Sequence, residues 1–469
     1  MNIESALTSV VGSSNVLTND DAAPYLTDWR GYYHGSAHCV VRPSTTDQVA
    51  QIVKLCAEHR TAIVPQGGNT GLVGGATPDA SGMAVVLLTT RLNQIRDLDL
   101  ANNTVTVEAG CILESLQKYC KDHDRLFPLS LAAEGSCTIG GNLASNAGGS
   151  QVLRYGAIRD LTLGLEVVTS DGQIWKGLNG LRKNNTGYDL KSLFVGSEGT
   201  LGIITAATLK VFPMPRVRHT ALVAVEGIEH CLALLERARA AFEANLTAFE
   251  VMADVCLRLV TEHFPDQHLP FHELSPHARW YVLLEIADSN IEDHVRTSFE
   301  TMLGDAYGAA EIVNAVVANS IDQSRSMWHL RESITLAQAK SGKSIKHDIA
   351  LPISRIPQFV DQMGQHLSKE FPGLTIMPFG HLGDGNLHYN VASSDDFNPE
   401  KLLQSQDEIY LAVHDTVHAY GGSISAEHGV GQLKRRELKR YKTSHELNMM
   451  QAIKSALDPL NILNPGKLL

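Results

Sequence analysis

The loop Pro65-Gln66-Gly67-Gly68-Asn69-Thr70-Gly71-Leu72-Val73-Gly74-Gly75 carries the strongest fold signal in this chain of 469 residues. It directly follows the short apolar stretch 61–64, which is typical of a buried strand, and five of its eleven residues are glycine. Because glycine has no Cβ, backbone N–H groups in such a loop can converge on an anion. The loop therefore predicts a diphosphate ligand, against the alternative of an ordinary glycine-rich turn.

Two further glycine-rich segments favour the ligand over the turn. Residues 135–149 (GSCTIGGNLASNAGG) place two glycine pairs among small polar residues. Residues 196–204 (GSEGTLGII) are a third glycine-rich segment. Close approach of backbone to a large flat ligand explains these segments better than turn chemistry does. No G-x-G-x-x-G is present, so a Rossmann fold lacks its fingerprint.

A second kind of motif lies near the C-terminus, in residues 380–390 (GHLGDGNLHYN). His381 and His388 stand seven residues apart across a glycine-containing turn, so they can flank one point in space. Glu427, in the segment 425–431 (SAEHGVG), would complete a set of two histidines and one carboxylate. Three protein ligands leave positions open for a substrate, as in catalytic zinc sites. The alternative is that these histidines cap turns or lie satisfied in the core.

A third cluster supplies positive charge. Arg331 and Thr335 are spaced i, i+4 and are expected on one helix face, and Lys346 follows. Arginine suits bidentate carboxylate binding, and lysine adds a compact charge. The chain has a net charge of −12, so an anionic substrate needs local cations, and nucleic-acid binding is disfavoured. The alternative for this cluster is a solvated helix face.

Together these motifs resemble the FAD-binding PCMH-type (vanillyl-alcohol oxidase) superfamily. With residues 28–31 (DWRG) and 181–190 (LRKNNTGYDL), the chain is most similar to its D-2-hydroxyglutarate and D-lactate dehydrogenase group, over essentially its whole length. Members with covalent flavin commonly have a histidine after the Gly-Gly of the first loop. Asn69 stands there in this chain, so the resemblance implies non-covalent FAD.

The resemblance also implies roles for individual residues. His381, His388 and Glu427 would bind Zn²⁺ or another divalent metal, and His428 would be the catalytic base. The residues expected to bind substrate are Arg331, Thr335, Lys346, Asn390 and His428. The residues expected to bind FAD are Pro65, Gln66, Gly67, Gly68, Asn69, Thr70, Gly71, Leu72, Gly135, Ser136, Gly140, Gly141, Asn142, Ser145, Asn146, Gly148, Gly149, Glu198, Gly202, Ile203, Ile204 and Asn464.

The implied reaction is the FAD- and metal-dependent oxidation of a D-2-hydroxy acid, foremost D-2-hydroxyglutarate, to the 2-oxo acid, with hydride transfer to flavin N5. A D-lactate or glycolate dehydrogenase of the same group, a metal-free flavin oxidase of alcohols or sugars, and a non-catalytic flavin-binding protein are the alternatives. Where the group usually has Lys-Tyr-Asp, this chain has Lys346-His347-Asp348, so His347 is expected to alter pocket polarity.

The expected fold class is α+β: a two-subdomain FAD-binding domain over residues 1–215, an α+β cap with an antiparallel sheet over 216–424, and a segment over 425–469 that returns to the FAD domain. The breaker cluster Phe212-Pro213-Met214-Pro215 marks the first boundary. Hydrophobic periodicity predicts helices over 47–60, 228–245, 291–303 and 444–457, and strands over 61–64, 85–89, 105–108, 163–168 and 280–286.

Partners and location rest on weaker signals. No apolar run approaches the roughly 20 residues that span a bilayer, and residues 1–20 contain no Arg or Lys. The seven cysteines are scattered, which favours a reducing compartment. We expect a cytoplasmic enzyme, with peripheral membrane attachment as an alternative. An electron-transfer flavoprotein, a quinone or a cytochrome remain open as electron acceptors, and a homodimer is compatible with the sequence.

Overall fold

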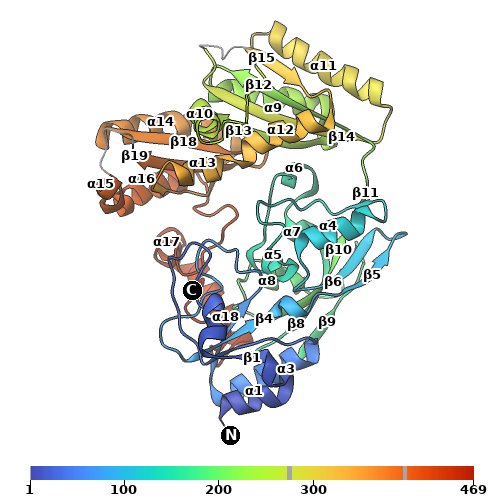
Figure 1. Ribbon diagram of the computed structural model, residues 1–469, viewed down its shortest axis with the longest axis vertical. Helices are drawn as coiled ribbons and strands as arrows, with labels where there is room; N and C mark the ends of the chain where they lie inside the picture. The colour runs from blue at the N-terminus through green and yellow to red at the C-terminus, as the bar shows by residue number, and fades with distance from the viewer. Residues whose placement is uncertain (1, 272–276, 394–398) are drawn as a thin grey trace. The chain divides into compact units, whose positions relative to one another are not determined.

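The computed structural model describes residues 2–271, 277–393 and 399–469. The chain folds into two compact units, each built from separate stretches of sequence (Figure 1). Unit 1 contains residues 1–149, 156–214 and 427–469. Unit 2 contains residues 150–155 and 215–426.

The first sheet of unit 1 has the strand order β1-β2-β4-β3, in which β2, β4 and β3 run parallel. Its strands are β1 (Val16–Leu17), β2 (Cys39–Val41), β3 (Ala62–Gln66) and β4 (Ala84–Leu88). Helices α1 (Ile3–Val11) and α3 (Thr46–His59) bury their apolar faces against it. Helix α3 begins where the Thr45 side chain accepts the N–H of Gln48, and it ends at Arg60 in a left-handed conformation.

The second sheet of unit 1 is antiparallel, with the order β5-β6-β10-β8-β9. Its strands are β5 (Ile95–Asp99), β6 (Thr104–Glu108), β8 (Thr162–Val168), β9 (Ile174–Gly177) and β10 (Ile203–Lys210), and β7 (Arg125–Leu126) pairs with β11 (Phe212–Pro213) apart from it. The helices between or after its strands are α4 (Leu113–Lys121), α5 (Ile139–Ser145), α7 (Ile158–Leu161) and α8 (Lys191–Phe194), whereas α2 (Asn19–Ala22) contacts β2 of the first sheet.

The last part of the chain belongs to unit 1. It forms helices α17 (Arg435–Tyr441) and α18 (Ser444–Leu457). Beyond them the backbone pairs with β3, because the N–H of Ile63 donates to Ile462 and the N–H of Asn464 donates to Ile63. The strand that leads into the glycine loop is therefore held by residues about 400 positions later in the sequence.

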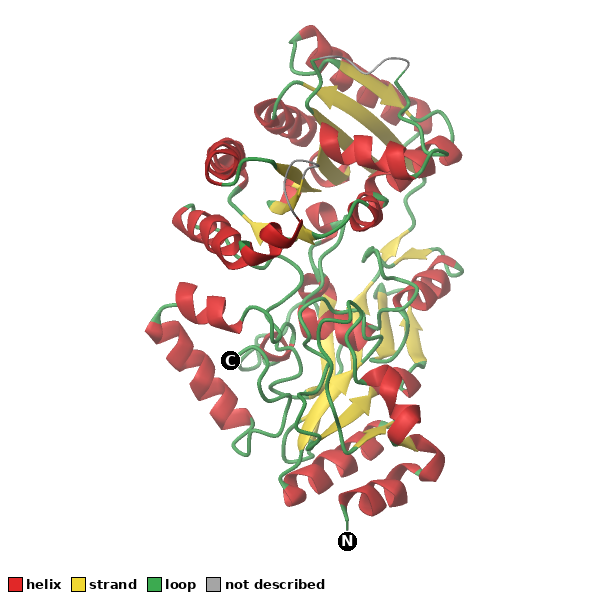
Figure 2. Ribbon diagram, turned by 60° about the vertical axis from the view of Figure 1, so that its left-hand side comes forward, coloured by secondary structure: helices red, strands yellow, loops and turns green. Residues whose placement is uncertain are grey.

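Unit 2 is built on one antiparallel sheet of eight strands, ordered β15-β12-β14-β13-β18-β19-β16, with β17 also pairing β19. Strands and helices of this unit are distinguished by colour in Figure 2. Its strands are β12 (Val217–Val225), β13 (Leu246–Ala253), β14 (Trp280–Asp288), β15 (Asn314–Val317), β16 (Ser344–Ile345), β17 (Ile349–Ala350), β18 (Leu374–His381) and β19 (Asn386–Ser393). Its helices are α6 (Val152–Tyr155), α9 (Ile228–Phe242), α10 (Asp254–His263), α11 (Glu292–Gly308), α12 (Ile321–Glu332), α13 (Ile334–Lys340), α14 (Ile356–Glu370), α15 (Pro399–Gln404) and α16 (Gln406–Ala419).

Helices cover the two faces of this sheet. Helices α10, α12 and α13 contact one another, and Arg331 of α12 reaches Glu250 in β13, so this group lies on the face that Glu250 occupies. Phe359 of α14 packs against Tyr389 of β19 on the other face, because neighbouring side chains of a strand alternate and His388 points to the Glu250 face. The face bearing Glu250 and His388 carries the site described below.

The fold class predicted from the sequence is confirmed, and the predicted helices and strands appear within a few residues of their expected bounds. One local prediction is wrong. Arg331 and Thr335 do not share one helix, because α12 ends at Glu332 and α13 begins at Ile334, with Ser333 between them. Arg331 is buried, whereas Thr335 is exposed, so the i, i+4 spacing does not place them in one environment.

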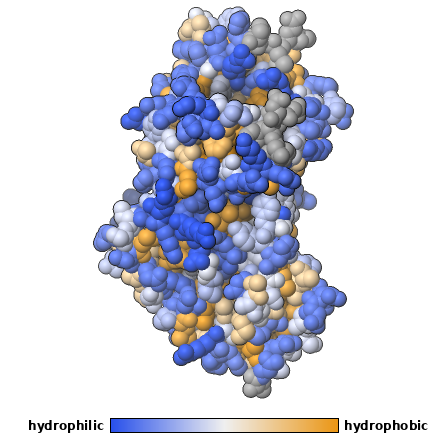
Figure 3. Space-filling model, turned by 90° about the vertical axis from the view of Figure 1, so that its left-hand side faces the viewer, coloured by the Kyte–Doolittle hydropathy of each residue, from blue (hydrophilic) through white to orange (hydrophobic). Residues whose placement is uncertain are grey.

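No helix among the described residues is long and apolar enough to cross a bilayer. On the face drawn in Figure 3, hydrophilic side chains predominate, and hydrophobic ones lie scattered among them. All seven cysteines are buried, and none forms a disulfide.

Candidate functional site

At Gly67 and Gly68, the glycine loop that follows β3 in unit 1 has no room for a side chain. A Cβ at Gly67 would lie 2.2 Å from Oγ1 of Thr138, and one at Gly68 would lie 2.0 Å from the carbonyl oxygen of Ser136. The loop and the segment around residue 137 therefore pack backbone against backbone. This is the close approach that the two glycine-rich segments predicted.

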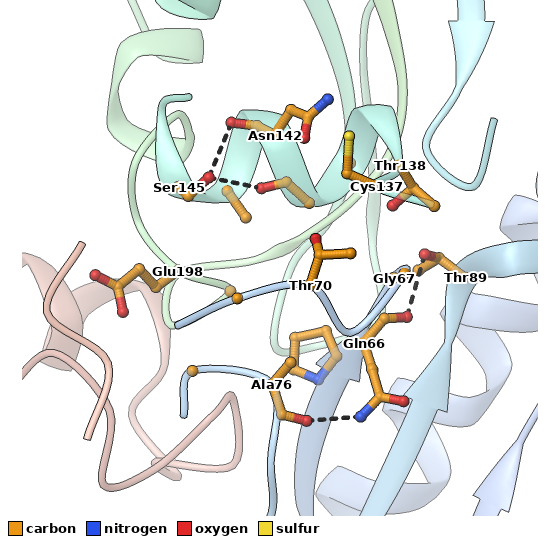
Figure 4. A pocket seen from close by; sticks show the side chains of 18 of the residues that line it. Gln66, Gly67, Thr70, Ala76, Thr89, Cys137, Thr138, Asn142, Ser145 and Glu198 are labelled. Atoms are coloured by element: carbon orange, nitrogen blue, oxygen red, sulfur yellow. Dashed lines mark hydrogen bonds between the residues drawn. The ribbon is translucent and has the colours of Figure 1, made fainter. Parts of the chain in front are cut away.

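A pocket opens along this loop within unit 1. Figure 4 shows the loop with Thr70 on one side and helix α5 with Asn142 and Ser145 on the other. The pocket is lined by Pro65, Gln66, Gly67, Gly68, Asn69, Thr70, Gly71, Val73, Gly75, Ala76, Thr89, Cys137, Thr138, Gly140, Gly141, Asn142, Ala144, Ser145, Glu198, Gly199, Gly202, Ile203, Ile204 and His428.

Most of the residues expected to bind FAD thus lie together. Seven expected residues are not among the lining residues: Leu72, Gly135, Ser136, Asn146, Gly148, Gly149 and Asn464. Conversely, the sequence analysis missed Val73, Gly75, Ala76, Thr89, Cys137, Thr138, Ala144 and Gly199. Strand β4 brings in Thr89, whose hydroxyl donates to the carbonyl of Gln66, and no local sequence signal marks that residue.

Four of the expected residues hold left-handed backbone conformations without being glycine. Their φ angles are 54° at Asn69, 52° at Asn146, 53° at Glu198 and 44° at Asn464. Asparagine tolerates this region best, and glutamate adopts it rarely. Such conformations cost free energy, and they gather where a site dictates the path of the backbone.

Glu198 binds the C-terminal stretch of unit 1, which begins at Glu427, to the wall of the pocket. Its carboxylate accepts the N–H groups of Val430 and Gly431, each at 2.7 Å. Burial raises the pKa of Glu198, although these two hydrogen bonds and the charge of Lys434 oppose the rise. The side-chain amide of Asn464 donates to the carbonyl of Glu198 at 2.7 Å. These contacts hold His428 in the pocket wall, two residues before Val430.

The donors and acceptors of the pocket suit a dinucleotide with a flat ring. Three buried polar atoms of its lining, Gln66 Oε1, Thr138 Oγ1 and Asn142 Nδ2, have no hydrogen-bond partner among the residues that the structure describes. Buried polar atoms are normally satisfied, so a polar ligand is the natural partner here. Apolar surface from Ile203 and Ile204 supplies a wall for a ring system. The residues present fit FAD.

In unit 2, the hairpin of β18 and β19 holds both predicted histidine ligands. His388 lies opposite Phe379 in the register, and His381 lies opposite Glu250 of β13, so both histidines point to the same sheet face. Their ring centroids are 5.9 Å apart. Two imidazoles at this separation can bind one cation. A short 3₁₀ turn and Gly385, with φ of 86°, close the hairpin between them.

Glu250 connects this pair to the cationic cluster, and the sequence analysis missed it. One carboxylate oxygen accepts from Nδ1 of His381 at 2.6 Å, and the other accepts from Nε of Arg331 at 2.8 Å. The Glu250 side chain is 1% exposed. Burial opposes its ionisation, but His381 and Arg331 outweigh burial and hold the pKa below its ordinary value. The available signal was a lone acid inside the apolar strand 246–253.

Arg331 is oriented by two contacts. Its Nε–H group donates to Glu250, and its guanidinium lies over the Phe379 ring, 4.8 Å from the centroid. Its terminal nitrogens have no acceptor among residues 2–271, 277–393 and 399–469, although the side chain is only 10% exposed. A buried guanidinium whose two terminal NH₂ groups are available as donors is suited to bidentate binding of a carboxylate ligand.

Asn390 lies on the same face and is held at both ends. Its Oδ1 accepts the backbone N–H of His347 at 3.1 Å, and its Nδ2 donates to Oε1 of Gln338 at 2.9 Å. The His347 ring contacts Tyr410 and His414 of α16, and its Nδ1–H donates to the carbonyl of Tyr389. His347 therefore meets Asn390 through its backbone, not through its ring.

Other predicted site residues fall in both units. Thr335 and the half-buried Lys346 belong to unit 2, while Glu427 and His428 open the last stretch of unit 1. The carboxylate of Glu427 accepts the N–H of Gly149 at 2.9 Å within unit 1. Ala426, one residue earlier, donates its N–H to the carbonyl of Asp348 in unit 2, and an oxygen of Asp348 lies 3.8 Å from Nδ1 of His388.

Fold and pocket together define a flavin-dependent oxidoreductase of PCMH type. The FAD binding domain family matches residues 37–177, and the family of FAD linked oxidases, C-terminal domain, matches residues 214–468. The chain belongs to this family of FAD-linked oxidases, as its glycine motifs predicted.

Relatives of known name align over most of the chain. It is 39% identical to the mitochondrial D-2-hydroxyglutarate dehydrogenase of Danio rerio, over 94% of this chain and 80% of the relative. It is 36% identical to the D-2-hydroxyglutarate dehydrogenase of Xanthomonas citri pv. viticola, over 96% of this chain and 92% of the relative. A putative mitochondrial D-lactate dehydrogenase of Schizosaccharomyces pombe is also 36% identical, over 95% and 84%.

Solved structures share the fold at low identity. p-Cresol methylhydroxylase with substrate bound superposes with a TM-score of 0.76 at 19% identity, covering 99% of this chain and 96% of that one. Alkyldihydroxyacetonephosphate synthase superposes with a TM-score of 0.75 at 18% identity, covering 99% and 86%. These neighbours confirm the expected fold.

Proposed function

We propose that this protein oxidises a D-2-hydroxy acid, foremost D-2-hydroxyglutarate, to the corresponding 2-oxo acid. The observation that carries the proposal is the unit 2 sheet face, where Glu250 joins the guanidinium of Arg331 to His381, and the His388 ring lies 5.9 Å from the His381 ring. An α-hydroxy carboxylate needs both a carboxylate receptor and a group that polarises its hydroxyl. The relatives named D-2-hydroxyglutarate dehydrogenase support the same substrate.

The divalent cation, Zn²⁺ in the first instance, would be held by His381, His388 and Glu427. Because Nδ1 of His381 donates to Glu250, its Nε2 is the unprotonated ring nitrogen and is the atom that would bind a metal. Glu427 follows Ala426 in the chain, and the N–H of Ala426 donates to the carbonyl of Asp348, whose carboxylate lies 3.8 Å from Nδ1 of His388. The donor set of two imidazoles and one carboxylate leaves open positions, as catalytic zinc requires.

The chain's own residues then have separate tasks. FAD, when bound, accepts the two electrons of the oxidation, and a divalent cation acidifies the hydroxyl of its ligand. His428, in the wall of the flavin pocket, accepts the proton of the C2 hydroxyl, since a neutral imidazole is a suitable general base. Arg331, Lys346 and Asn390 bind the carboxylates, and the exposed position of Thr335 gives no support to its predicted part in this set.

A dicarboxylate is favoured over a monocarboxylate. The metal can serve only one end of the substrate, and a second carboxylate needs its own donors because burying it alone is costly. Arg331 and Lys346 provide two cations, which is more than D-lactate can use. The relative named as a putative D-lactate dehydrogenase keeps D-lactate as the second candidate. A charge-assisted hydrogen bond of about 1.5–3 kcal/mol would separate the two by roughly 10- to 150-fold.

Anaerobic reduction of the bound flavin tests the proposal. D-2-hydroxyglutarate should bleach the flavin fastest, D-lactate more slowly and L-2-hydroxyglutarate not at all. Fastest bleaching by D-lactate would replace the first candidate with the second. No bleaching by any D-2-hydroxy acid would contradict both. We further propose that the flavin is reoxidised by a separate acceptor, and a panel of an electron-transfer flavoprotein, a quinone and a cytochrome would identify it.

A further inference from the structure

Glu250 stands between two groups to which the proposed function gives different tasks. It lies at the centre of β13, with β18 as the neighbouring strand, and its side chain is enclosed. One oxygen meets Nδ1 of His381 and the other meets Nε of Arg331. A metal ligand and an anion receptor therefore depend on the same buried carboxylate.

Both partners of Glu250 are donors, so only a carboxylate satisfies the two at once. Nδ1–H of His381 requires an acceptor if the other ring nitrogen is to bind a cation, and Nε–H of Arg331 requires an acceptor if the terminal fork is to face a ligand. A side-chain amide offers one acceptor oxygen and one NH₂ group. An amide at position 250 would therefore lose one of the two partners, or lose alignment with both.

We propose that Glu250 is a positioning residue that fixes His381 for metal binding and Arg331 for substrate carboxylate binding. The inference rests on the proposed function and extends it to a residue outside the metal and substrate sets. Glu250 contacts neither metal nor substrate in this scheme. It acts through the two side chains that do, so its loss should weaken metal retention and substrate affinity together.

The same sheet contains a matched control. Glu285 of β14 is also a buried glutamate, and it accepts from Nε1 of Trp328 at 3.1 Å and from the hydroxyl of Thr220 at 3.2 Å. Its cationic neighbour is Arg218 at 3.7 Å. Glu285 shares the burial and sheet position of Glu250, but it contacts no residue of the proposed metal or substrate sets. Any general cost of losing a buried carboxylate should appear in both variants.

The test compares Glu250→Gln with Glu285→Gln in the FAD-loaded protein. Zn²⁺ retention is measured without substrate, by elemental analysis after equilibration with graded chelator, and KM and kcat are measured separately. Glu250→Gln should weaken Zn²⁺ retention by roughly 10- to 100-fold, since supporting contacts to metal ligands have this effect, and it should raise KM for D-2-hydroxyglutarate. FAD content should match wild type. Glu285→Gln should change neither Zn²⁺ retention nor KM.

A second variant guards against misfolding. Glu250→Asp keeps the charge on a shorter side chain, and it should retain Zn²⁺ better than Glu250→Gln does. If both Glu250 variants unfold while Glu285→Gln stays folded, Glu250 is a structural residue and the inference is wrong. Unchanged Zn²⁺ retention and KM in Glu250→Gln also overturn it. A wild-type protein that binds no divalent ion contradicts the proposed metal site itself, which is a different failure.

Discussion

The flavin pocket of unit 1 and the sheet face of unit 2 are made in different ways. The pocket is shaped by backbone, because Gly67 and Gly68 lie against neighbouring segments and Asn69 and Glu198 hold left-handed conformations. The sheet face is shaped by charged side chains that hold one another, with Glu250 between His381 and Arg331. Substitutions in the flavin pocket should therefore disrupt ligand binding through steric clash. Substitutions on the sheet face should disrupt it by removing a charge or by misaligning the side chains that remain.

The largest effect is expected from Gly68→Ala. The new methyl group would lie 2.0 Å from the backbone oxygen of Ser136, and backbone cannot move aside as a flexible side chain can. We expect loss of FAD, measured by flavin absorbance of the purified protein, with a clear fall in melting temperature. Gly304→Ala in helix α11 is the control, because a Cβ there meets nothing within 4 Å outside its own helix and the residue lies outside the pocket. A stable, yellow Gly68→Ala protein would contradict the claim that close backbone packing shapes the flavin pocket.

His388→Ala should abolish turnover while leaving the flavin bound. The histidine lies in β19 of unit 2, away in sequence from the glycine loops. Losing a metal worth several kcal/mol lowers kcat/KM by roughly 1,000-fold or more. Elemental analysis should show loss of the metal, and flavin absorbance of the same sample should show that FAD is retained. His366→Ala, at an exposed histidine, is the control. Full activity after chelator treatment of wild type would remove the metal from the scheme.

A smaller effect is expected from Arg331→Lys, which keeps the charge but removes the planar fork and the Nε contact with Glu250. KM for D-2-hydroxyglutarate should rise roughly 10- to 150-fold, since a charge-assisted hydrogen bond is worth about 1.5–3 kcal/mol. Arg325→Lys in the same helix is the control, because its Asp322 partner is exposed. Equal KM values for the two variants would show that charge alone suffices.

The smallest effect is expected from Gln338→Leu. Leucine leaves Nδ2 of Asn390 without its acceptor, and a buried unsatisfied donor costs about 1 kcal/mol or more, which corresponds to roughly 5-fold. The cost should appear in KM, because Asn390 would lose its fixed orientation. Gln365→Leu, at an exposed helical pair with Asp361, should leave KM unchanged. An unchanged KM in Gln338→Leu would show that the His347 N–H alone orients Asn390.

The comparison also explains what sequence could reveal. A backbone-made pocket leaves glycines at fixed spacing, so the loop at 65–75 and most of the pocket lining were predictable. The two histidines were predictable because one hairpin carries both. Glu250 was missed, since it joins the site only through the register of β13 with β18. Register and strand order depend on pairing between distant segments, which local patterns do not encode.

Arg331 and Thr335 show a second limit. Their spacing fits one helix, but Ser333 ends α12 and a new helix begins at Ile334. Serine is only mildly unfavourable in a helix, so composition gave no warning of the break. Thr89 shows a third limit, because it reaches the pocket from the 3₁₀ turn that follows β4, and no motif of its own marks it.

The pairing of Ile63 with Ile462 and Asn464 has a consequence for folding during synthesis on the ribosome. β3 precedes the glycine loop and is made early, but its last partners emerge only after all of residues 215–426. Domains generally fold as units during synthesis, so unit 2 can fold while unit 1 still waits for its end. A nascent chain should become yellow only after residues 462–464 have been made, so flavin binding would report that translation has passed these partners of β3.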